Sequence, residues 1–556
     1  MNVIIFLCFY LLNFFLGRGV LLFFSSNKNS DNFDSRSYSG IKYDTFYSIF
    51  SLLFFGNLLF IINFFLPLEN SFYILFIFSF LLFLYNFKEK FVIKDFNGLL
   101  IKHLFIPIIL SITTYGSWLH FDSGAYHLNY QYWLRTEKIT FGLANLNFGY
   151  GFSSILEYLE AILWFDKNYL FIYFINLIFY CLLFSFIYEG IFSSNGILKT
   201  SSFLLLIFGI LDNFGYQGGA NGFFRFQAIA KPDMPFAIIF VILSLLIIDK
   251  ISKKEYVFSD IKIFSIFSLF LFQIKLLGLY IGILFFYYLY KFYRKNEKYL
   301  IEIFTQLLPS LSLGLLWSLK NFILSGCLLF PIKQSCFKNV NWYVDGYINK
   351  YIYSTKIEQK AYFLGESFNE WFNIFLNKAN NKQIFVNFLI SIFLLVVLRR
   401  LVFNHQKNKE VKYLLFSLNS IYLITWLTSS PSPRWGAHLF PFLVVTIAIN
   451  YSFKNNILKN KIFNRATLAI LFLTIGMMPR SYSYLSFFDD FNTLTIVSIP
   501  QVEYTSNQSG DGFIVDVGYQ PQQCWVNKYC LLSDKKIIEG ELLNYKVYLP
   551  DGSKKW

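Results

Sequence analysis

Apolar stretches about as long as a lipid bilayer is thick recur along most of this 556-residue chain. Two examples are "TFYSIFSLLFFGNLLFIINFFL" at 45–66 and "IFVNFLISIFLLVVL" at 384–398. A helix needs about 20 apolar residues to cross the hydrocarbon core of a bilayer. Because 56% of the residues are hydrophobic and only 15% are charged, the composition excludes an ordinary soluble protein. The sequence therefore predicts a polytopic membrane protein.

The spacing of these stretches predicts an all-α, polytopic transmembrane helical bundle of about 14 spans. The predicted spans are 3–24, 45–66, 71–86, 104–119, 169–190, 201–212, 235–249, 261–273, 275–290, 300–320, 384–403, 412–429, 436–452 and 466–478. We divide the chain into a transmembrane domain at 1–478 and a C-terminal segment at 479–556. Alternating Val, Ile and Phe followed by Pro and Gly predict that this segment is a small ordered cap.

Lys and Arg concentrate in alternate loops, which the positive-inside rule places in the cytoplasm. These loops lie near 28–42, 88–102, 250–254, 291–298, 399–412 and 454–465. The segments predicted to be extracytoplasmic are 120–168, 213–234, 321–383, 430–435 and 479–556. This assignment requires two separate spans within 261–290, with Lys275 near their outer turn. The net charge of +15 is spread over short loops, so we interpret it as topological and predict no nucleic-acid partner.

The only closely spaced cysteines are Cys524 and Cys530, in "QQCWVNKYC", whereas Cys336 is isolated in a long loop. A Cys524–Cys530 disulfide requires an oxidising compartment, which is where the charge rule places the tail. Two free thiols in a surface turn remain the alternative.

The segment "FDSGAYHLNYQYWL" at 121–134 follows an apolar run almost without a gap. A carboxylate fixed there meets a reactive group held at the membrane surface, so Asp122 is the leading candidate for a general base. The alternative is that Asp122 caps the helix that follows. Tyr126 and Trp133 fit either an aromatic belt at the interface or a platform for a sugar ring.

Residues 121–164 resemble the first outer loop of the GT-C superfamily of membrane glycosyltransferases, which take sugar from a polyprenyl-phosphate carrier. In that loop an acid stands a few residues beyond a span, and two surface helices follow. The motifs D-x-x-x-Y-H (122–127), G-L-A-N-L (142–146) and "GFSS" (151–154) are similar to those of an uncharacterised bacterial family of polytopic membrane proteins. The resemblance continues in "AKPDMPFAIIFVILSLL" (230–246), "LKNFILSGCLLFPIKQ" (319–334), "SSPSPRWGAHLFPF" (429–442) and the Cys-Trp tail. Lys320 and Leu328 depart from the Arg and Pro of that pattern.

The resemblance implies a GT-C-type, inverting glycosyltransferase with Asp122 as its catalytic base. It implies a polyprenyl-phosphate sugar donor, a lipid-linked or envelope glycan acceptor, membrane lipids as further partners, and a site on the extracytoplasmic side of the bacterial cytoplasmic (inner) membrane. Cations would hold the phosphate, and Arg434 suits it best because a planar guanidinium matches phosphate oxygens. The candidate substrate-binding residues are Tyr126, His127, Trp133, Asn145, Arg225, Lys231, Asp233, Lys275, Lys320, Arg434 and His438. Interfacial anchoring remains the alternative for Arg434, and snorkelling for Lys275.

The sequence contains no H-x-x-x-H and no compact carboxylate cluster, so no metal site is assigned. A divalent ion held by Asp122, Asp233 and Glu157 is left open. The absence of GxGxxG and Walker motifs, and of a DxD in a cytoplasmic loop, gives no support to nucleotide-sugar use or ATP-driven transport. The rival functions are a polyprenyl-linked oligosaccharide flippase, a polysaccharide polymerase or ligase using the large loop at 321–383, and a non-catalytic assembly protein. Transporters usually contain repeats, and none is evident in this sequence.

Overall fold

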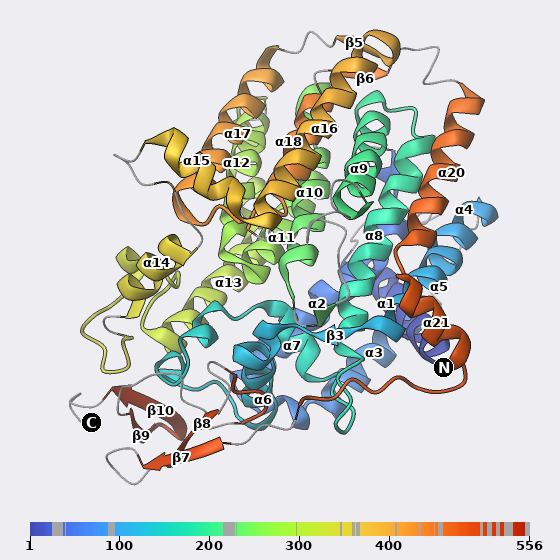
Figure 1. Cartoon of the computed structure of the whole chain (residues 1–556). Coiled ribbons are helices and arrows are strands. Elements are labelled where there is room, and N and C mark those ends of the chain that lie inside the picture. Colours follow the sequence, from blue (N-terminus) through green and yellow to red (C-terminus); the bar gives the residue numbers. More distant parts are fainter. Residues whose placement is uncertain are drawn as a thin grey trace.

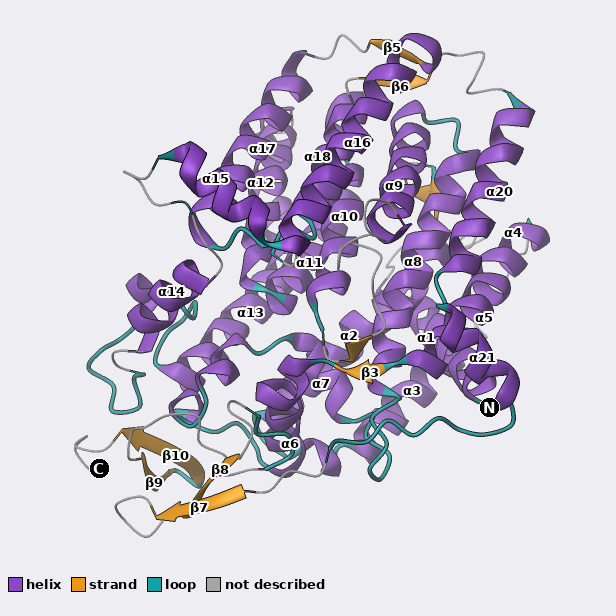
Figure 2. Cartoon of the chain, in the orientation of Figure 1, coloured by secondary structure: helices purple, strands orange, loops and turns teal. Residues whose placement is uncertain are grey.

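The described part of the chain is mainly helical in this computed structural model (Figures 1 and 2). The structure describes residues 1–24, 37–38, 40–86, 95–214, 228–229, 231–295, 297–344, 347–358, 362, 367–405, 409–432, 435–449, 451–453, 460–500, 504–508, 514–518, 523–527 and 537–550. The α-helices are α1 (Asn2–Phe24), α2 (Tyr47–Asn63), α3 (Phe72–Asn86), α4 (Phe96–Leu100), α5 (Ile106–Ser111), α6 (Leu128–Thr136), α7 (Ile155–Ala161), α8 (Ile172–Phe192), α9 (Gly196–Phe214), α10 (Asp233–Lys253), α11 (Phe258–Ile274), α12 (Ile281–Lys295), α13 (Leu300–Ser325), α14 (Tyr347–Glu358), α15 (Phe368–Asn377), α16 (Ala379–Val402), α17 (Lys409–Ser429), α18 (Leu439–Ile449), α20 (Lys461–Met477) and α21 (Ser481–Asp489).

The strands are short and form two-stranded pairs. They are β1 (Ser37–Tyr38), β2 (Ile41–Lys42), β3 (Trp118–Leu119), β4 (Ala228–Ile229), β5 (Phe403–His405), β6 (Tyr451–Phe453), β7 (Tyr504–Gln508), β8 (Ile514–Gly518), β9 (Ile537–Leu542) and β10 (Tyr545–Pro550). The pairs β7–β8 and β9–β10 are antiparallel and belong to the C-terminal segment, where the sequence predicts a small cap. The β3–β4 pair is parallel and joins two segments that are far apart in the sequence.

Seven helical segments in the described residues are long and apolar enough to cross a membrane. They are Asn2–Phe24, Tyr43–Asn63, Phe96–Gly116, Ile172–Phe192, Asp233–Lys253, Leu276–Lys295 and Leu300–Ser325. The pair α20 and α21, bent by 67°, gives an eighth if it counts as one broken span. The six other predicted spans also fall on helices, but several of these are shorter than the roughly 20 residues that a bilayer requires, such as α11 and α18. A membrane protein is therefore supported, whereas the count of about 14 spans stays a prediction.

The predicted alternation of loops between two ends of the bundle is visible in the contacts. At one end Lys42 lies 2.7 Å from Asp95, and Asn195 donates to Asp249 at 2.8 Å, so three basic loops meet there. We call this the upper end, because Figure 1 draws β5 and β6 there as well. The lower end carries α6, α7 and β7–β10. The chain breaks between α11 and α12 at Lys275, which confirms that 261–290 holds two separate helices.

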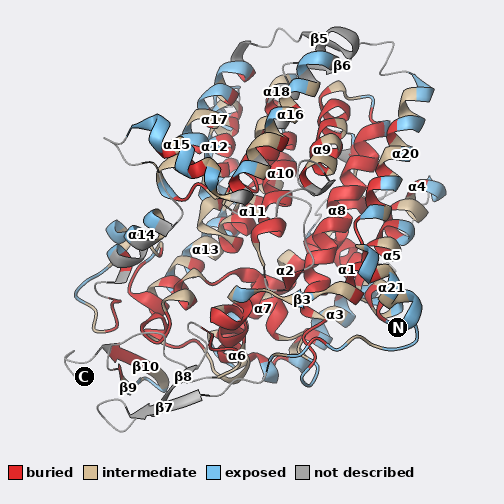
Figure 3. Ribbon diagram, viewed as in Figure 1, coloured by how far each residue is buried: buried red, intermediate tan, exposed pale blue. Residues whose placement is uncertain are grey.

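The core of the bundle is built around α8 and α10. Their most apolar 18-residue windows are 100% and 94% buried, and both helices appear almost entirely red in Figure 3. A helix that is apolar on every side has to be surrounded by other helices or by lipid. On the periphery, α13 leaves large apolar side chains such as Ile301 and Leu315 exposed, as expected of a surface that faces lipid.

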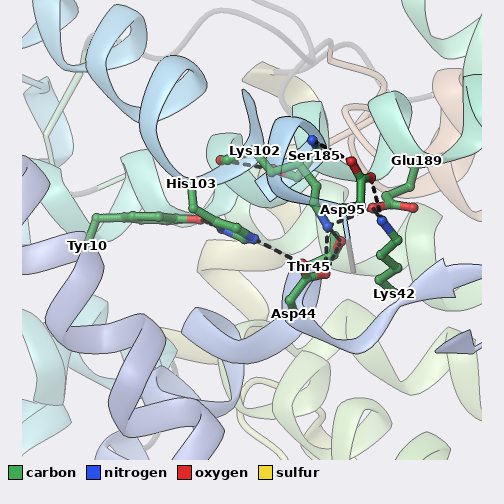
Figure 4. A network of polar contacts seen from close by, with 10 residues as sticks. Tyr10, Lys42, Asp44, Thr45, Asp95, Lys102, His103, Ser185 and Glu189 are labelled. Atoms are coloured by element: carbon green, nitrogen blue, oxygen red, sulfur yellow. Dashed lines mark hydrogen bonds and ion pairs between the residues drawn. The ribbon is translucent and has the colours of Figure 1, made fainter. Parts of the chain in front are cut away.

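A buried polar network joins α1 and α8 to the turn before α2 and to the segment between α4 and α5 (Figure 4). Its titratable members are Tyr10, Lys42, Asp44, Asp95, Lys102, His103 and Glu189. Lys102 is fully buried, and its Nζ lies 2.6 Å from both Asp44 Oδ1 and Glu189 Oε1. His103 Nε2 lies 3.5 Å from Asp44 Oδ2. From the sequence, Lys102 is interpreted as one of the charges of a cytoplasmic loop; its burial between two carboxylates corrects that interpretation.

Candidate functional site

Asp122 lies at the lower end of the bundle, three residues after β3 and directly before a five-residue π-helix at Ser123–His127. Its side chain is 13% exposed, so it is largely shielded from solvent. The side chain makes no capping hydrogen bond to this helix. The structure therefore gives no support to the alternative in which Asp122 serves as a helix cap.

His120 is the neighbour that faces the Asp122 carboxylate. Its Nδ1 lies 3.5 Å from Asp122 Oδ2 and accepts a hydrogen bond from the Asp122 backbone N–H at 3.2 Å. Because Nδ1 acts as an acceptor, the proton of the neutral ring lies on Nε2. In this tautomer His120 holds the backbone of Asp122, and its Nδ1 does not donate to the Asp122 carboxylate.

The parallel pair β3–β4 brings the second outer segment beside the first. Trp118 pairs with Ala228 and Leu119 with Ile229, and Ser123 Oγ donates to the Ile229 carbonyl at 2.9 Å. Lys231 follows Ile229 by two residues. The pairing thus places a predicted phosphate-binding cation close in the fold to the segment that carries Asp122.

Three of the predicted site residues meet where α10, α11 and α18 converge. Asp233, at the start of α10, forms an ion pair with Lys275 at the break after α11. The Lys275 Nζ also lies 5.4 Å from the ring of Trp435. His438 packs edge-on against Phe236 of α10, with ring centroids 5.2 Å apart. Buried ion pairs within a membrane bundle are costly, and such pairs commonly mark functional sites.

A second acid–histidine pair of the first outer loop is formed by His127 and Glu157. His127 Nδ1 lies 2.6 Å from Glu157 Oε1, and Glu157 also closes the capping box of α7 by accepting from the Ser154 backbone N–H. The Tyr126 ring lies 4.2 Å from the His127 ring. His127 Nε2 is buried and has no hydrogen-bond partner within the described part of the chain. This nitrogen is available to a polar ligand or to water.

A second carboxyl of α7, that of Glu160, is buried and forms no ion pair with any residue that the structure describes. Glu160 Oε2 accepts from Gln131 at 2.6 Å, and Gln131 in turn accepts from Trp164 at 2.8 Å. Burial, together with the nearby charge of Glu157, raises the pKa of Glu160 well above its usual value. The folded protein therefore holds a proton on Glu160 that the unfolded chain releases at lower pH.

This raised pKa predicts a stability that falls as the pH rises. At pH values above the ordinary glutamate pKa, the folded state keeps a proton on Glu160 that the unfolded state has lost. The free energy of unfolding therefore decreases as the pH rises from that pKa to the higher pKa of folded Glu160. Replacing Glu160 by Gln should flatten this decline at pH values above the ordinary glutamate pKa. The measurement is the melting temperature of detergent-solubilised protein across this range. Glu302→Gln, which changes an exposed acid on α13, is the control, and equal slopes for wild type and Glu160→Gln would exclude this role.

The other predicted site residues make internal contacts. Trp133 is buried and meets Tyr548 of β10 edge-on at 5.6 Å. Asn145 donates to the carbonyls of Trp342 and Tyr548, at 3.1 and 3.0 Å. The Lys320 ammonium bonds Ser153 Oγ and lies 3.6 Å from the ring of Trp317. These contacts hold the first outer loop against α13 and the C-terminal hairpin.

The C-terminal tail docks directly on the segment that contains Asp122. The backbone N–H groups of Cys524 and Trp525 both donate to the Gly124 carbonyl at 2.7 Å. Gln523 donates to the Phe121 carbonyl at 3.1 Å. The candidate site is thus assembled from the first outer loop, the segment around Lys231 and the end of the chain.

Residues 1–441 match the model of a family described as a domain of unknown function, DUF8201. The chain belongs to this family. The match covers Asp122, the Asp233–Lys275 pair and His438, but ends before the tail. No match was found among curated proteins or solved structures.

Three residues predicted for this DUF8201 protein lie outside the described residues: Arg225, Arg434 and Cys530. Cys524 is disulfide-bonded. A second disulfide joins Cys327 to Cys336, which corrects the interpretation of Cys336 as isolated. Within the described ranges, no three His, Cys, Asp or Glu side chains are grouped to hold a metal ion, so Asp122, Asp233 and Glu157 do not converge as a ligand set.

The sequence did not predict that the tail docks beside Asp122, that His120 faces Asp122, or that Gly124 contacts the tail. The one nearby residue type that could have indicated this docking is the glycine two residues after Asp122. A Cβ on Gly124 would overlap the Gln523 amide and lie 2.7 Å from the Trp525 ring, so this position accepts no side chain while the tail is docked. The glycine marks a close approach between two parts of the chain.

Gly124→Ala should displace the tail of this DUF8201 protein. The expected results are faster proteolysis within 523–550 of the solubilised protein and loss of its cellular function. Gly540→Ala is the matched control, because a Cβ there meets no atom within 4 Å. A tail as protease-resistant in Gly124→Ala as in wild type would contradict the docked arrangement.

Proposed function

We propose that this protein is a GT-C-type membrane glycosyltransferase that moves a sugar from a polyprenyl-phosphate-linked donor to a lipid-linked or envelope glycan acceptor. The observation that carries the proposal is the placement of Asp122. Its carboxylate is largely shielded from solvent at one end of a membrane bundle. The strand that precedes Asp122, β3, pairs with β4, and β4 leads directly to Lys231 and to the Asp233–Lys275 ion pair. Such a site has a base and cations but is partly closed to water, which is what glycosyl transfer from a phosphate requires.

The proposed reaction is a direct displacement at the anomeric carbon. Asp122 takes the proton from an acceptor hydroxyl, and that oxygen bonds to the anomeric carbon while the bond from this carbon to the phosphate oxygen breaks. The electron pair of the broken bond leaves with the polyprenyl phosphate. Lys231 and Lys275 are the described cations placed to stabilise this charge. His127 and His438 are proposed to orient the sugar by hydrogen bonding.

The proposed sidedness places the lower end outside the cytoplasm of a bacterial inner membrane. The Cys327–Cys336 disulfide supports it, because disulfides persist in oxidising compartments. Phe330, between these cysteines, packs against Phe148 at 4.7 Å, so the disulfide belongs to the same end as the first outer loop. The basic loops of the upper end support the same orientation. We extend the proposal to about 14 spans in total.

The test is to analyse the envelope glycan and the lipid-linked intermediates by mass spectrometry in a deletion strain and in the complemented strain. A transferase predicts loss of one sugar from the glycan and accumulation of an intermediate that lacks this sugar. A flippase predicts complete lipid-linked units that remain in the inner leaflet, and a polymerase predicts intact repeat units with short chains. An unchanged glycan in the deletion strain would refute the proposal.

A further inference from the structure

A hollow of about 380 Å³ opens at the lower end of the bundle, between the segment that leads into β3 and β3 itself on one side and the C-terminal segment on the other. The residues that line it come from two distant parts of the sequence. They include Ser117 and Trp118 from the first outer segment, and Thr495, Ser498 and Trp525 from the C-terminal segment. Its volume lies within the range of about 300–1,000 Å³ found for small-molecule sites. Neither the sequence motifs nor the proposed roles of the cations account for this hollow.

Two contacts connect the hollow to the segment that carries Asp122. The Trp118 ring lies 5.9 Å from the His120 ring, and His120 faces the Asp122 carboxylate. On the other side, the Trp525 backbone N–H donates to Gly124, two residues beyond Asp122. The hollow is therefore bordered on two sides by residues that contact the segment carrying Asp122.

The described residues of the walls combine two indole rings and hydroxyl groups with aliphatic side chains, and none of these residues is charged. Trp118 is 47% exposed, which leaves much of its side chain open to contact. Trp525 is buried, and its Nε1 has no hydrogen-bond partner among the described residues. A buried N–H without a partner is unfavourable and is commonly satisfied by a ligand or a water molecule. Ser498 and Thr495 add further hydroxyls to the lining.

We propose that this hollow binds the neutral carbohydrate end of the glycosyl acceptor, an inference that rests on the proposed function. The apolar C–H face of a pyranose packs on an indole ring, and its hydroxyls bond to N–H and O–H groups. A phosphate is disfavoured because none of the lining residues that the structure describes is a cation. Donor and acceptor thus bind on different sides of Asp122: the donor phosphate near Lys231 and Lys275, and the acceptor sugar on Trp118 and Trp525.

The test measures binding of a defined probe to full-length protein in nanodiscs. The probe is the oligosaccharide mixture released by mild acid from the envelope glycan of the deletion strain, and binding is followed by saturation-transfer NMR. Wild type should bind saturably, Trp118→Ala about tenfold more weakly, and Trp118→Phe with most of the wild-type affinity. Phe121→Ala is the matched control, an exposed aromatic of the same segment that does not line the hollow. Gel filtration verifies that each variant is folded.

The outcomes separate this inference from the proposed function. Asp122→Asn should bind the probe like wild type and fail only in transfer. Transfer by wild type combined with an unchanged acceptor KM in Trp118→Ala would overturn the acceptor site and leave the transferase standing. Saturable binding that requires Trp118, in a protein that transfers no sugar, would refute the transferase and leave a carbohydrate-binding site. Wild-type protein that does not bind the probe would overturn the inference.

Discussion

Replacing Asp122 by Asn is expected to reduce sugar transfer by about 10²–10⁴-fold, the usual contribution of a general base. The amide keeps the size and hydrogen-bonding shape of the carboxylate but does not take up a proton. Because the Asp122 side chain makes no capping bond, the variant should fold and accumulate like wild type. The measurement is the glycan composition of a deletion strain complemented with either form at matched membrane abundance.

The control for this experiment is Asp166→Asn in the same outer loop. Asp166 is exposed and adopts a positive φ of 53°, a conformation that Asn also tolerates. This variant should restore the glycan fully. If Asp122→Asn restores it equally well, Asp122 is structural, and transport or an assembly role becomes the better account of the protein.

Lys102→Met should destabilise the fold by about 3–5 kcal/mol, the cost of removing one partner from a buried ion pair. Lys102 is the cation that contacts both Asp44 and Glu189 at 2.6 Å. Without it, two buried carboxylates face each other with much less compensation. The expected result is a sharp fall in melting temperature and in the yield of monodisperse protein on detergent gel filtration.

A second variant distinguishes charge from packing. Lys102→Met combined with Asp44→Asn and Glu189→Gln removes the uncompensated charges and should recover much of the lost stability. Lys298→Met, on an exposed segment at the same end, should have no effect. A Lys102→Met protein that melts like wild type would mean that the network of Figure 4 contributes little to stability.

The sequence was most informative where hydrophobic length and loop charge decide the structure. The apolar runs predicted helices, and the alternation of basic loops predicted which segments meet at each end. The loop charges also predicted the break at Lys275, because a single continuous helix over 261–290 would place every later basic loop on the opposite side of the membrane. Charge counting failed at Lys102, since a lysine at the edge of an apolar run looks the same whether it faces water or two buried carboxylates.

The candidate site was only partly predictable. Asp122 could be chosen because an acid just beyond an apolar run is unusual, and Lys275 because a cation within one is costly. The β3–β4 pairing could not be predicted, because each strand has only two residues, which is too short for an alternating hydrophobic pattern. The same holds for Gln523 and Trp525, whose partners lie about four hundred positions earlier in the chain.

The docking of residues 523–527 on Gly124 has a consequence for biogenesis. All the helices must be inserted, and the tail delivered to the lower end, before the hollow acquires its Trp525 wall. An unfinished chain that already carries Asp122 in place has no complete site. The hollow is therefore completed only late in synthesis and membrane insertion, and a polypeptide still emerging from the ribosome lacks its C-terminal wall.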